Sequence, residues 1–469
     1  MESQQQLRDS DKDTRPSLSP IDRQYASSPP QIERRIHILG TGSIGKLVAH
    51  SLAGLPNPPP ITLLLHRYSL LQAWEKGRKE VTIQDGPGGA KVARGGFEVE
   101  LVEEVRRQHG VVVERKKADV FDVAEGARVR PDEAAKMLHD AEKAQPPAGD
   151  ALTAEAGEQQ QQPGPTTYYR PGGSGQGDHA YSSEPIHNLI VTTKASLTIP
   201  ALLRIKHRIS RSTTICFLQN GMGIVEAVND SLFPDPETRP SYVQGILTHG
   251  VNVPPETATR DPFFAVHAGH GTIALGALPR KPSPTDQDAK DEIWAPSARY
   301  LLRTLTRCPV LCAVGFTPTE LLQQQLEKLA VNSVLNPLTA LLDARNGSLL
   351  YNFALTRTLR LLLAETSLVI RSLPELQSIP NINTRFSASR LESLVVTVAD
   401  KTKDNISSML ADVRAGRKTE IDFINGYIVR RGEEVGVSCV VNYGIMQTVV
   451  GKAMLTQREA REDVPMDRR

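Results

Sequence analysis

The stretch RRIHILGTGSIGKLVAHSLAG, residues 34–54, joins a short apolar run, a glycine turn and an amphipathic run. This order predicts a buried strand, a tight turn and a helix. In the GxGxxG pattern of Gly40, Gly42 and Gly45, the first glycine permits the turn, the second lets the backbone approach a pyrophosphate, and the third allows the helix to pack closely on the strand. The helix N-terminus adds free N–H groups and a positive dipole end. The stretch therefore predicts the start of a dinucleotide-binding domain, against the simpler interpretation of a glycine-rich turn without a ligand.

The segment ITLLLHR, residues 61–67, predicts the second strand, and its end indicates which dinucleotide is bound. Folds that prefer NAD usually place an acidic residue there for the ribose hydroxyl groups, whereas an arginine suits the 2′-phosphate of NADP. Here the strand ends in His66 and Arg67, with no acidic residue. This favours NADP(H); the alternative is a solvated arginine at the end of a strand.

Two later apolar runs also end in polar residues. HNLIVTTKA (187–195) places Lys194 at its end, and TTICFLQNGMG (213–223) places Asn220 there. Ligands of open α/β sheets bind outside the carboxyl ends of the strands, so both side chains are expected on the cofactor side. The alternatives are a solvated lysine and an Asn-Gly turn. Further predicted elements are a hairpin over 81–105, a helix over 198–209, and strands over 241–251 and 263–278.

Composition excludes several classes of function. The chain has 469 residues and a net charge of +2, which is too balanced to indicate binding to nucleic acid or to acidic membranes. No segment reaches the roughly 18 uninterrupted apolar residues of a membrane span. Residues 1–20 lack the apolar core of a secretory signal, and their acidic residues weaken a mitochondrial targeting interpretation without excluding it. A cytoplasmic location is expected, with a mitochondrial one as the alternative.

The four cysteines, Cys216, Cys308, Cys312 and Cys439, predict reduced thiols of an intracellular protein. Cys308 and Cys312 have a separation that metal ligands also show, but no second Cys or His pair follows at a matching interval. No metal site is therefore expected.

Composition also divides the chain into segments. Residues 1–34 are polar and contain Pro and Ser, which predicts a disordered tail. Residues from about 123 to 184 include a glutamine run with Pro, Gly and Ser, which predicts a low-complexity insertion. This insertion interrupts an α/β domain predicted over 35–312. A Leu-rich helical domain is predicted over 313–456, and a polar tail over 457–469.

The segment EKLAVNSVLNPLTA, residues 327–340, predicts a helix with an unusual polar stripe. Lys328, Asn332 and Asn336 follow at spacings of four, so they share one face, while most residues between them are apolar. Burying such groups is costly without a partner, which a bound polar ligand would supply. Pro337 predicts a kink or an end of the helix near Asn336.

A second polar set lies in DNISSMLADVRAGRKTEIDFING, residues 404–426. Ser408 and Glu420 would face the same general side if one helix ran through the segment, although Gly416 is able to interrupt it. An ordinary surface carboxylate is the alternative for Glu420.

One combination of motifs runs along the chain: GTGSIG (40–45), NLIVTTKA (188–195), LQNGMG (218–223), THGV (248–251), KLAVNSVLNPLTA (328–340), ARNG (344–347) and NISSMLADVRAGRKTEIDFING (405–426). This combination resembles the ketopantoate reductase (2-dehydropantoate 2-reductase) family. The resemblance implies a Rossmann-like domain joined to a C-terminal helical domain, with the active site in the cleft between them. It also implies NADPH-dependent reduction of 2-dehydropantoate to (R)-pantoate, on the route to pantothenate and coenzyme A.

The resemblance implies a role for each matching residue. Lys328 would be the proton donor. The substrate would be bound by Asn220, Asn332, Asn336, Asn346 and Ser408. The cofactor would be bound by Gly40, Thr41, Gly42, Ser43, Ile44, Gly45, Arg67, Lys194, Asn220, Val251 and Glu420. A monomer or a homodimer is expected.

Two alternatives to this function stay open at the level of sequence. The Asn, Ser and Lys set suits other small branched 2-oxo acids, so a reductase of another such acid is one alternative. A protein that has lost catalysis and acts as a binding or regulatory module is the other. The intact site set and the low net charge argue against the second.

Overall fold

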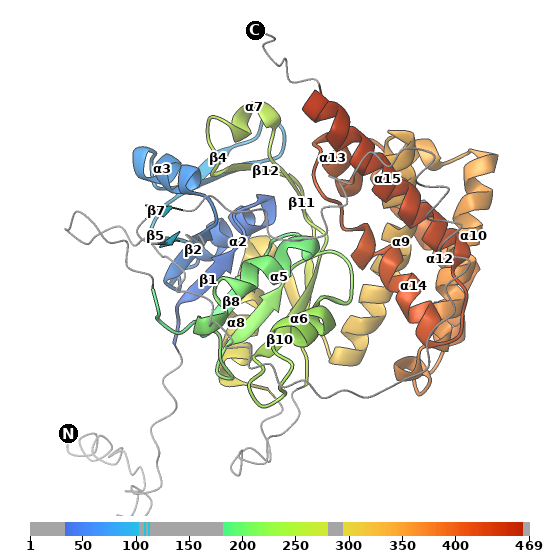
Figure 1. The fold of residues 1–469 in the computed structure, drawn as a ribbon, viewed down its shortest axis with the longest axis horizontal. Coiled ribbons are helices and arrows are strands. Elements are labelled where there is room, and N and C mark those ends of the chain that lie inside the picture. Colours follow the sequence, from blue (N-terminus) through green and yellow to red (C-terminus); the bar gives the residue numbers. More distant parts are fainter. Residues whose placement is uncertain (1–32, 103–106, 109–110, 113–181, 280–293, 463–469) are drawn as a thin grey trace, which may run out of the picture.

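The computed structural model describes residues 33–102, 107–108, 111–112, 182–279 and 294–462. Sheets with flanking helices form one part of the molecule, and a group of long helices forms the other (Figure 1). This arrangement confirms the predicted fold class, a Rossmann-like α/β domain followed by a helical domain. Almost all of the tail predicted over 1–34 and of the insertion predicted over 123–184 lies outside the described residues.

The larger sheet is eight-stranded, in the order β14-β13-β10-β9-β8-β1-β2-β5. Its mutually parallel strands are β1 (Ile36–Leu39), β2 (Ile61–Leu65), β5 (Phe97–Leu101), β8 (Asn188–Val191), β9 (Thr214–Phe217) and β10 (Ser241–Leu247). β13 (Ile273–Ala277) pairs antiparallel with β10, and β14 (Ala313–Gly315) pairs with β13. Counted along the chain, the parallel strands lie in the order 3-2-1-4-5-6 that is typical of dinucleotide-binding folds. The order reverses between β1 and β8, and ligands of such sheets bind at this point, beyond the carboxyl ends of the strands.

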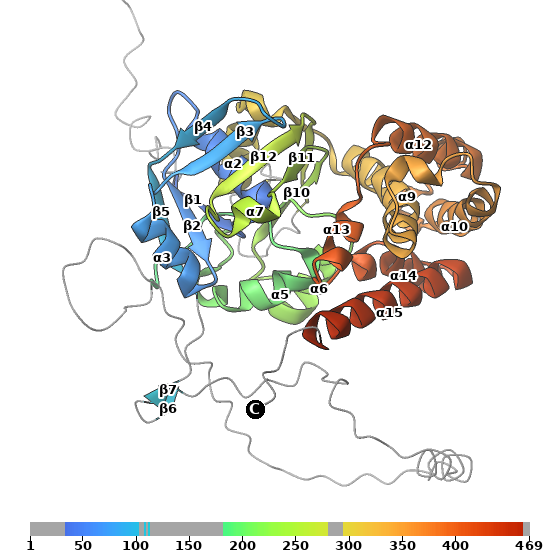
Figure 2. The ribbon, with the colours of Figure 1, turned by 90° about the horizontal axis from the view of Figure 1, so that it is seen from above.

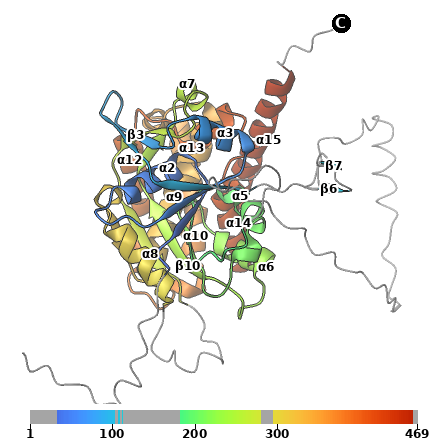
Figure 3. The ribbon, with the colours of Figure 1, turned by 90° about the vertical axis from the view of Figure 1, so that its left-hand side faces the viewer.

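Helices cover both faces of this sheet. They are α2 (Ser43–Ala53), α3 (Tyr68–Lys76), α5 (Ala195–Leu203), α6 (Ile224–Leu232) and α8 (Pro296–Thr306), with the short 3₁₀ helices η2 (Lys206–Arg208) and η3 (Pro309–Leu311). The short helix α7 (Pro255–Ala258) lies instead beside the second, smaller sheet. Successive side chains of a strand point to opposite faces, so Leu39 packs with residues of α5 and α6 while Ile38 packs with residues of α2 and α8. Figure 3 shows α5 and α6 on one side of the strands and α8 on the other. Because both faces are buried, most positions of the strands are apolar.

A smaller, four-stranded sheet, called here the accessory sheet, lies against α2 in the order β11-β12-β3-β4. Its strands are β3 (Val81–Asp85), β4 (Lys91–Arg94), β11 (Gly250–Asn252) and β12 (Phe264–Gly269). Lys46 of α2 donates to the Phe264 carbonyl at 3.0 Å, and His50 Nε2 lies 3.0 Å from the Val92 carbonyl. β3 and β4 confirm the first part of the hairpin predicted over 81–105, but Phe97–Leu101 form β5 of the larger sheet instead. The remaining strands are the two-residue pair β6 (Arg107–Gln108) and β7 (Val111–Val112).

The sequence predicts one strand over 241–251 and one over 263–278, and this is wrong. Each segment contains two strands that belong to different sheets, β10 and β13 to the larger sheet and β11 and β12 to the accessory sheet. The chain crosses between the sheets where Thr248 N donates to the Thr272 carbonyl at 2.9 Å and Thr272 N donates to Thr248 Oγ1 at 2.7 Å. An apolar run gives no sign of such a change of sheet.

The second part of the molecule consists of helices packed around one apolar core. They are α9 (Pro318–Leu342), α10 (Phe353–Ser372), α11 (Ile382–Arg385), α12 (Ala388–Lys401), α13 (Ser408–Arg414), α14 (Asn425–Glu434) and α15 (Val440–Glu462), with η4 (Asn346–Leu349), η5 (Pro374–Leu376) and η6 (Ile421–Phe423). α13 lies on the side of this part that faces the sheets (Figure 2). Among the described residues, no helix has both the length and the apolar character needed to cross a membrane.

Three boundaries differ from those predicted. The larger sheet continues through β14 to Gly315, beyond the boundary expected at residue 312. α15 continues to Glu462, past the start of the predicted polar tail. α9 runs through Pro337 to Leu342 and does not end near Asn336.

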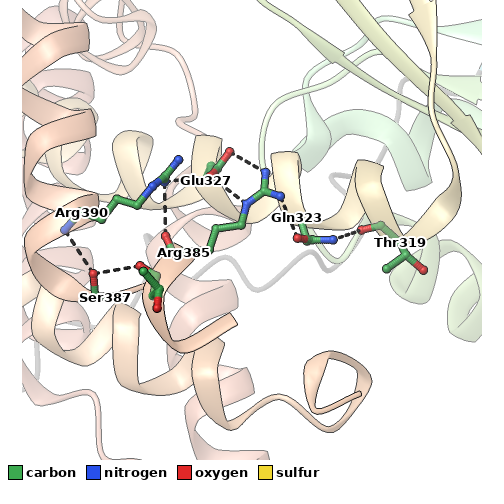
Figure 4. Close-up of polar contacts among 7 residues, drawn as sticks. Thr319, Gln323, Glu327, Arg385, Ser387 and Arg390 are labelled. Carbon is green, nitrogen blue, oxygen red and sulfur yellow. Dashed lines mark hydrogen bonds and ion pairs between the residues drawn. The ribbon is translucent and has the colours of Figure 1, made fainter. Parts of the chain in front are cut away.

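The two sides of α9 have different partners. On one side, Arg385 donates to both carboxylate oxygens of Glu327 at 3.0 and 3.1 Å and to Gln323 at 2.8 Å, and Arg390 donates to Glu327 at 3.0 Å (Figure 4). These contacts tie α9 to α11 and α12 and fix its rotation about its own axis. Lys328, the next residue along the helix, is therefore held toward the sheets.

Candidate active site

The glycine turn follows β1 directly. Gly40 has φ of +105°, a conformation that suits glycine, and Thr192 Oγ1 donates to its carbonyl oxygen at 2.6 Å. A Cβ on Gly45 would lie 1.9 Å from that same carbonyl oxygen, so Gly45 must be glycine for the helix to pack on the strand. A Cβ on Gly42, the N-cap of α2, would have no atom within 4 Å. Gly40 and Gly45 thus serve the fold, whereas the space above Gly42 is available to a bound phosphate.

Alanine substitutions should separate these two roles. Gly42→Ala is expected to leave the unfolding temperature unchanged and to weaken dinucleotide binding by roughly tenfold or more, about 1.4 kcal/mol, because the new methyl group occupies the space above the turn. Gly45→Ala is expected to destabilise the protein by ~1–3 kcal/mol, because its methyl group meets the backbone. Thermal unfolding and fluorescence titration of the two variants measure both effects. Equal dinucleotide affinity in Gly42→Ala and wild type would contradict the assignment.

Arg67 and Lys194 lie at the carboxyl ends of β2 and β8. Arg67 is exposed at the N-cap of α3, and its Nε donates to His66 Nε2 at 2.8 Å. Burial, together with the positive charges of Arg67 and Arg204, lowers the pKa of His66. Cationic groups therefore gather where the sequence predicts a 2′-phosphate.

Lys194 has a partner that the sequence did not indicate. Its Nζ forms an ion pair with Asp412 of α13, and Asp412 also accepts a hydrogen bond from Arg417 Nε at 3.1 Å. The Asp412 side chain is only 3% exposed, so this contact links the two parts of the molecule through a buried carboxylate.

Lys328 of α9 points toward the larger sheet. Its Nζ donates to the Leu247 carbonyl at 2.7 Å and to Asn220 Oδ1 at 3.0 Å. Burial lowers the pKa of Lys328 to about 8, although the nearby Glu420 carboxylate opposes the shift. An ammonium with this pKa releases a proton far more easily than an exposed lysine does.

A chain of hydrogen bonds continues from Lys328. Asn220 Nδ2 donates to Glu420 Oε2 at 3.4 Å, and the Ala195 N–H donates to Glu420 Oε1 at 3.0 Å. Glu420 is buried, with 7% of its surface exposed, and burial raises its pKa. The interpretation of Glu420 as a surface carboxylate is therefore wrong. Asn220 is fixed between the ammonium and the carboxylate, with its amide oxygen toward Lys328.

A pocket that opens to solvent lies beside Lys328. Its wall includes Gln219, Asn220 and Met222 after β9, Ile246 of β10, and Lys328 and Asn332 of α9. The structure thus brings Lys328, Asn220 and Asn332 together around one cavity.

The other predicted substrate ligands do not line this pocket. Asn336 is buried one turn beyond Asn332 on α9, and Asn346 of η4 donates to Thr402 Oγ1 at 2.9 Å. Ser408 is exposed at the first turn of α13. α13 ends at Arg414, and Gly416 has φ of +61°, so Ser408 and Glu420 do not share one helix.

The remaining predicted cofactor residues are placed as follows. Thr41 lies in the turn, and Ser43 and Ile44 open α2. Val251 is half-buried on β11 of the accessory sheet. The predicted cofactor residues thus come from both sheets.

Sequence reasoning missed several residues of the site. Gln219 and Gln325 line the pocket, and the Leu247 backbone carbonyl holds Lys328. Gln219 directly precedes Asn220 in LQNGMG, and Asp412 lies within SSMLADVR, so both were inside motifs that had been singled out. The sequence pattern alone could not show which residues of these two motifs face the pocket or the other part of the molecule.

Comparison with known proteins gives consistent matches. The family model "Ketopantoate reductase PanE/ApbA" matches residues 149–280, and "Ketopantoate reductase PanE/ApbA C terminal" matches residues 320–453. The chain is 33% identical over 265 residues to the "Probable 2-dehydropantoate 2-reductase" of Schizosaccharomyces pombe, covering 56% of this chain and 73% of that protein. It is 27% identical over 430 residues to "Ketoisovalerate reductase BEA2" of Gibberella fujikuroi, covering 85% of this chain and 78% of that protein.

A solved structure shows the same fold. The crystal structure of the probable 2-dehydropantoate 2-reductase of Bacillus subtilis matches with a TM-score of 0.53 and 20% identity, over 89% of this chain and 99% of that chain.

Proposed function

The chain belongs to the ketopantoate reductase family of oxidoreductases, and we propose that it reduces the keto group of 2-dehydropantoate with NADPH, on the route to pantothenate and coenzyme A. The observation that carries this proposal is the position of Lys328. Its side chain is half-buried, its ammonium is held by an amide and a backbone carbonyl of the sheet part, and it borders a pocket.

Lys328 supplies what reduction of a ketone needs from the protein. Negative charge develops on the carbonyl oxygen during the reaction, and a cation within hydrogen-bonding reach stabilises it and delivers a proton. The Lys328 Nζ holds that proton, and its lowered pKa eases the transfer. Asn220 and the Leu247 carbonyl fix the ammonium in place, so little reorganisation is needed when the charge develops.

The residues around the glycine turn fit a nicotinamide dinucleotide. The open space above Gly42 and the N-terminus of α2 would hold its phosphate groups. Arg67, with no acidic residue beside it at the end of β2, favours NADPH. When bound, the cofactor would supply the hydride.

Asn332 and Asn220 provide the substrate contacts of the pocket. Their amides can donate to and accept from the carbonyl and hydroxyl groups of a small 2-oxo acid. Asn336, Asn346 and Ser408 would join them only if the part that carries α9 and α13 closes further onto the sheets when ligands bind.

A second candidate substrate is 2-ketoisovalerate. The match to a ketoisovalerate reductase spans 85% of this chain, against 56% for the S. pombe 2-dehydropantoate 2-reductase. The two acids differ by the hydroxymethyl group that only 2-dehydropantoate carries. A site built to hydrogen-bond a hydroxyl group rejects an analogue that lacks it by a factor of roughly 10⁴–10⁵. The ratio of kcat/KM values for the two acids therefore decides between them.

The testing experiment measures initial rates of NADPH oxidation with each acid, alongside NADH. Fast oxidation with NADPH and 2-dehydropantoate supports the proposal. Activity confined to 2-ketoisovalerate would move the substrate and keep the chemistry. A folded protein that binds NADPH and reduces neither acid would overturn the reductase assignment in favour of a binding role.

The pH dependence should report the Lys328 ammonium. A proton donor is active while protonated, so kcat/KM is expected to stay high below the pKa of about 8 and to fall as the pH rises through it. A pH profile of kcat/KM in the wild-type protein measures this limb. A profile that is flat across this range, or that rises through it, would contradict the role of Lys328.

A further inference from the structure

Three side chains that the proposed reaction does not use converge at the end of the accessory sheet. Asp85 is the last residue of β3, His267 lies on β12, and His270 follows β12. β3 and β12 are parallel and His267 pairs directly with Asp85, so the two side chains point to the same face. His270 Nε2 lies 2.8 Å from Asp85 Oδ1, and one ligand atom from each of the three residues lies within 4.8 Å of the others.

The backbone around these residues is fixed by the surrounding chain. Gly86 N donates to the His267 carbonyl at 3.0 Å, which joins the ends of β3 and β12. On the far side of His270, a Cβ on Gly271 would lie 2.5 Å from His249 N, so this glycine packs tightly against the neighbouring strand connection. The three Cα positions are thus held without any contribution from the side chains of the cluster.

A fourth histidine orients the ring of His267. His249 Nε2 faces the Leu311 carbonyl at 3.0 Å and must carry a proton, so its Nδ1 is an acceptor. That Nδ1 receives the Gly271 N–H at 3.1 Å and lies 2.9 Å from His267 Nε2, which must then be protonated. When Nε2 carries the proton, a neutral His267 has its lone pair on Nδ1, and the Gly269 carbonyl also lies within hydrogen-bonding reach of this ring. Metal-bound histidines are typically held in this way, with the second ring nitrogen donating to a fixed partner.

We propose that Asp85, His267 and His270 bind a divalent transition-metal ion of the Zn²⁺ type. Two imidazoles and one carboxylate are ligands that suit Zn²⁺, Co²⁺ or Ni²⁺, whereas Mg²⁺ and Ca²⁺ prefer oxygen ligands alone. The side chains of Asp85 and His270 are 65% and 68% exposed, so they can adjust to the metal–ligand distances of about 2.0–2.2 Å at little cost, and water can complete the coordination. His267 is 2% exposed and provides the rigid anchor.

None of these three residues lines the pocket beside Lys328, and the proposal does not depend on the proposed reaction. An ion bound by them would join the ends of β3 and β12 and stabilise the accessory sheet. A ligand that binds the folded state alone raises stability in proportion to the logarithm of its concentration over its dissociation constant. Added metal should therefore raise the unfolding temperature.

The test uses the full chain without an affinity tag, stripped with a chelator and titrated with ZnCl₂ by calorimetry. All proteins in the test, including the parent, carry Cys312→Ser, because Cys312 is exposed and an exposed thiol binds zinc by itself. The compared proteins carry Asp85→Asn, His270→Ala or, as a control, His207→Ala, which changes an exposed histidine elsewhere. Titration with Co²⁺ gives a second readout, because the visible absorption of bound Co²⁺ depends on which side chains coordinate it.

One equivalent of Zn²⁺ is expected in the parent and in His207→Ala. In Asp85→Asn and His270→Ala, which each lose a ligand, binding should weaken at least as much as it does when an outer-shell partner is lost, on the order of tenfold or more. Both positions are exposed, so both variants should unfold at the parent temperature when no metal is present. The proposal is overturned if the parent binds no stoichiometric Zn²⁺, or if all four proteins bind it equally.

Discussion

Lys328→Ala is expected to lower kcat by a factor on the order of 10²–10⁴, the usual contribution of a general acid. The substitution removes the ammonium that Leu247 and Asn220 hold beside the pocket, and no other described cation lines that pocket. The Asn220 amide keeps its bond to Glu420, so the wall of the pocket should persist. Steady-state kinetics at a pH below 8, with cofactor affinity measured separately, gives the effect on turnover alone.

Lys452→Ala is the matched control for this experiment. Lys452 also donates from Nζ to a backbone carbonyl, that of Leu341 at 2.7 Å, near the opposite end of α9. Its loss should leave kcat within about twofold of wild type, because Lys452 does not line the pocket. Near-normal turnover in Lys328→Ala, or an equal loss in both variants, would remove Lys328 from its assigned role.

Arg208→Ala is expected to destabilise the protein by ~3–5 kcal/mol, because it leaves a buried charge without its partner. The side chains of Arg208 and Glu100 are 0% and 2% exposed, and Arg208 Nη1 lies 2.8 Å from Glu100 Oε2. Arg208 Nε also donates to the Glu184 carbonyl at 2.7 Å, so the pair fastens the edge strand β5 to η2. Urea unfolding followed by fluorescence measures the loss.

Two further variants test whether the buried charge is the cause. Arg360→Ala breaks an exposed pair with Glu392 and should leave the urea midpoint of unfolding nearly unchanged. The double variant Arg208→Met with Glu100→Leu removes both charges and should recover much of the stability lost in Arg208→Ala. If the double variant is as unstable as Arg208→Ala, lost packing is the explanation and the electrostatic one is wrong.

Local signals in the sequence predicted the start of the fold well. The glycine turn and the apolar runs around it act over a few residues, so β1, α2 and β2 appear where the sequence placed them. The polar stripe on α9 was also a local signal, since Lys328 and Asn332 share a helix face by spacing alone, and both border the pocket. Their assigned roles stay predictions that kinetics must test.

Features that depend on distant contacts could not be predicted. β3 pairs with β12, and Lys194 with Asp412, across long separations in sequence, and no spacing rule links such segments. The same holds for Asp85 and His270, because the spacing of His267 and His270 becomes meaningful only when β3 lies beside them. Whether Ser408 and Glu420 share one helix depended on the backbone conformation of Gly416. The sequence left that conformation undecided, and in the structure its positive φ ends the helix before Glu420.

The course of α9 has a consequence for protein engineering. Its first turns lie against the larger sheet, where Leu321 packs over Gly276, and its later turns form the centre of the helical core. Lys328 and Asn332 lie where α9 passes from the sheet part of the molecule to the helical part. A chimera that exchanges the helical halves of two relatives should therefore join the chains at Phe316, between β14 and the Thr317 cap of α9. A junction there would transfer Lys328 and Asn332 as one inherited unit, whereas a junction inside α9 would combine half-sites of different ancestry.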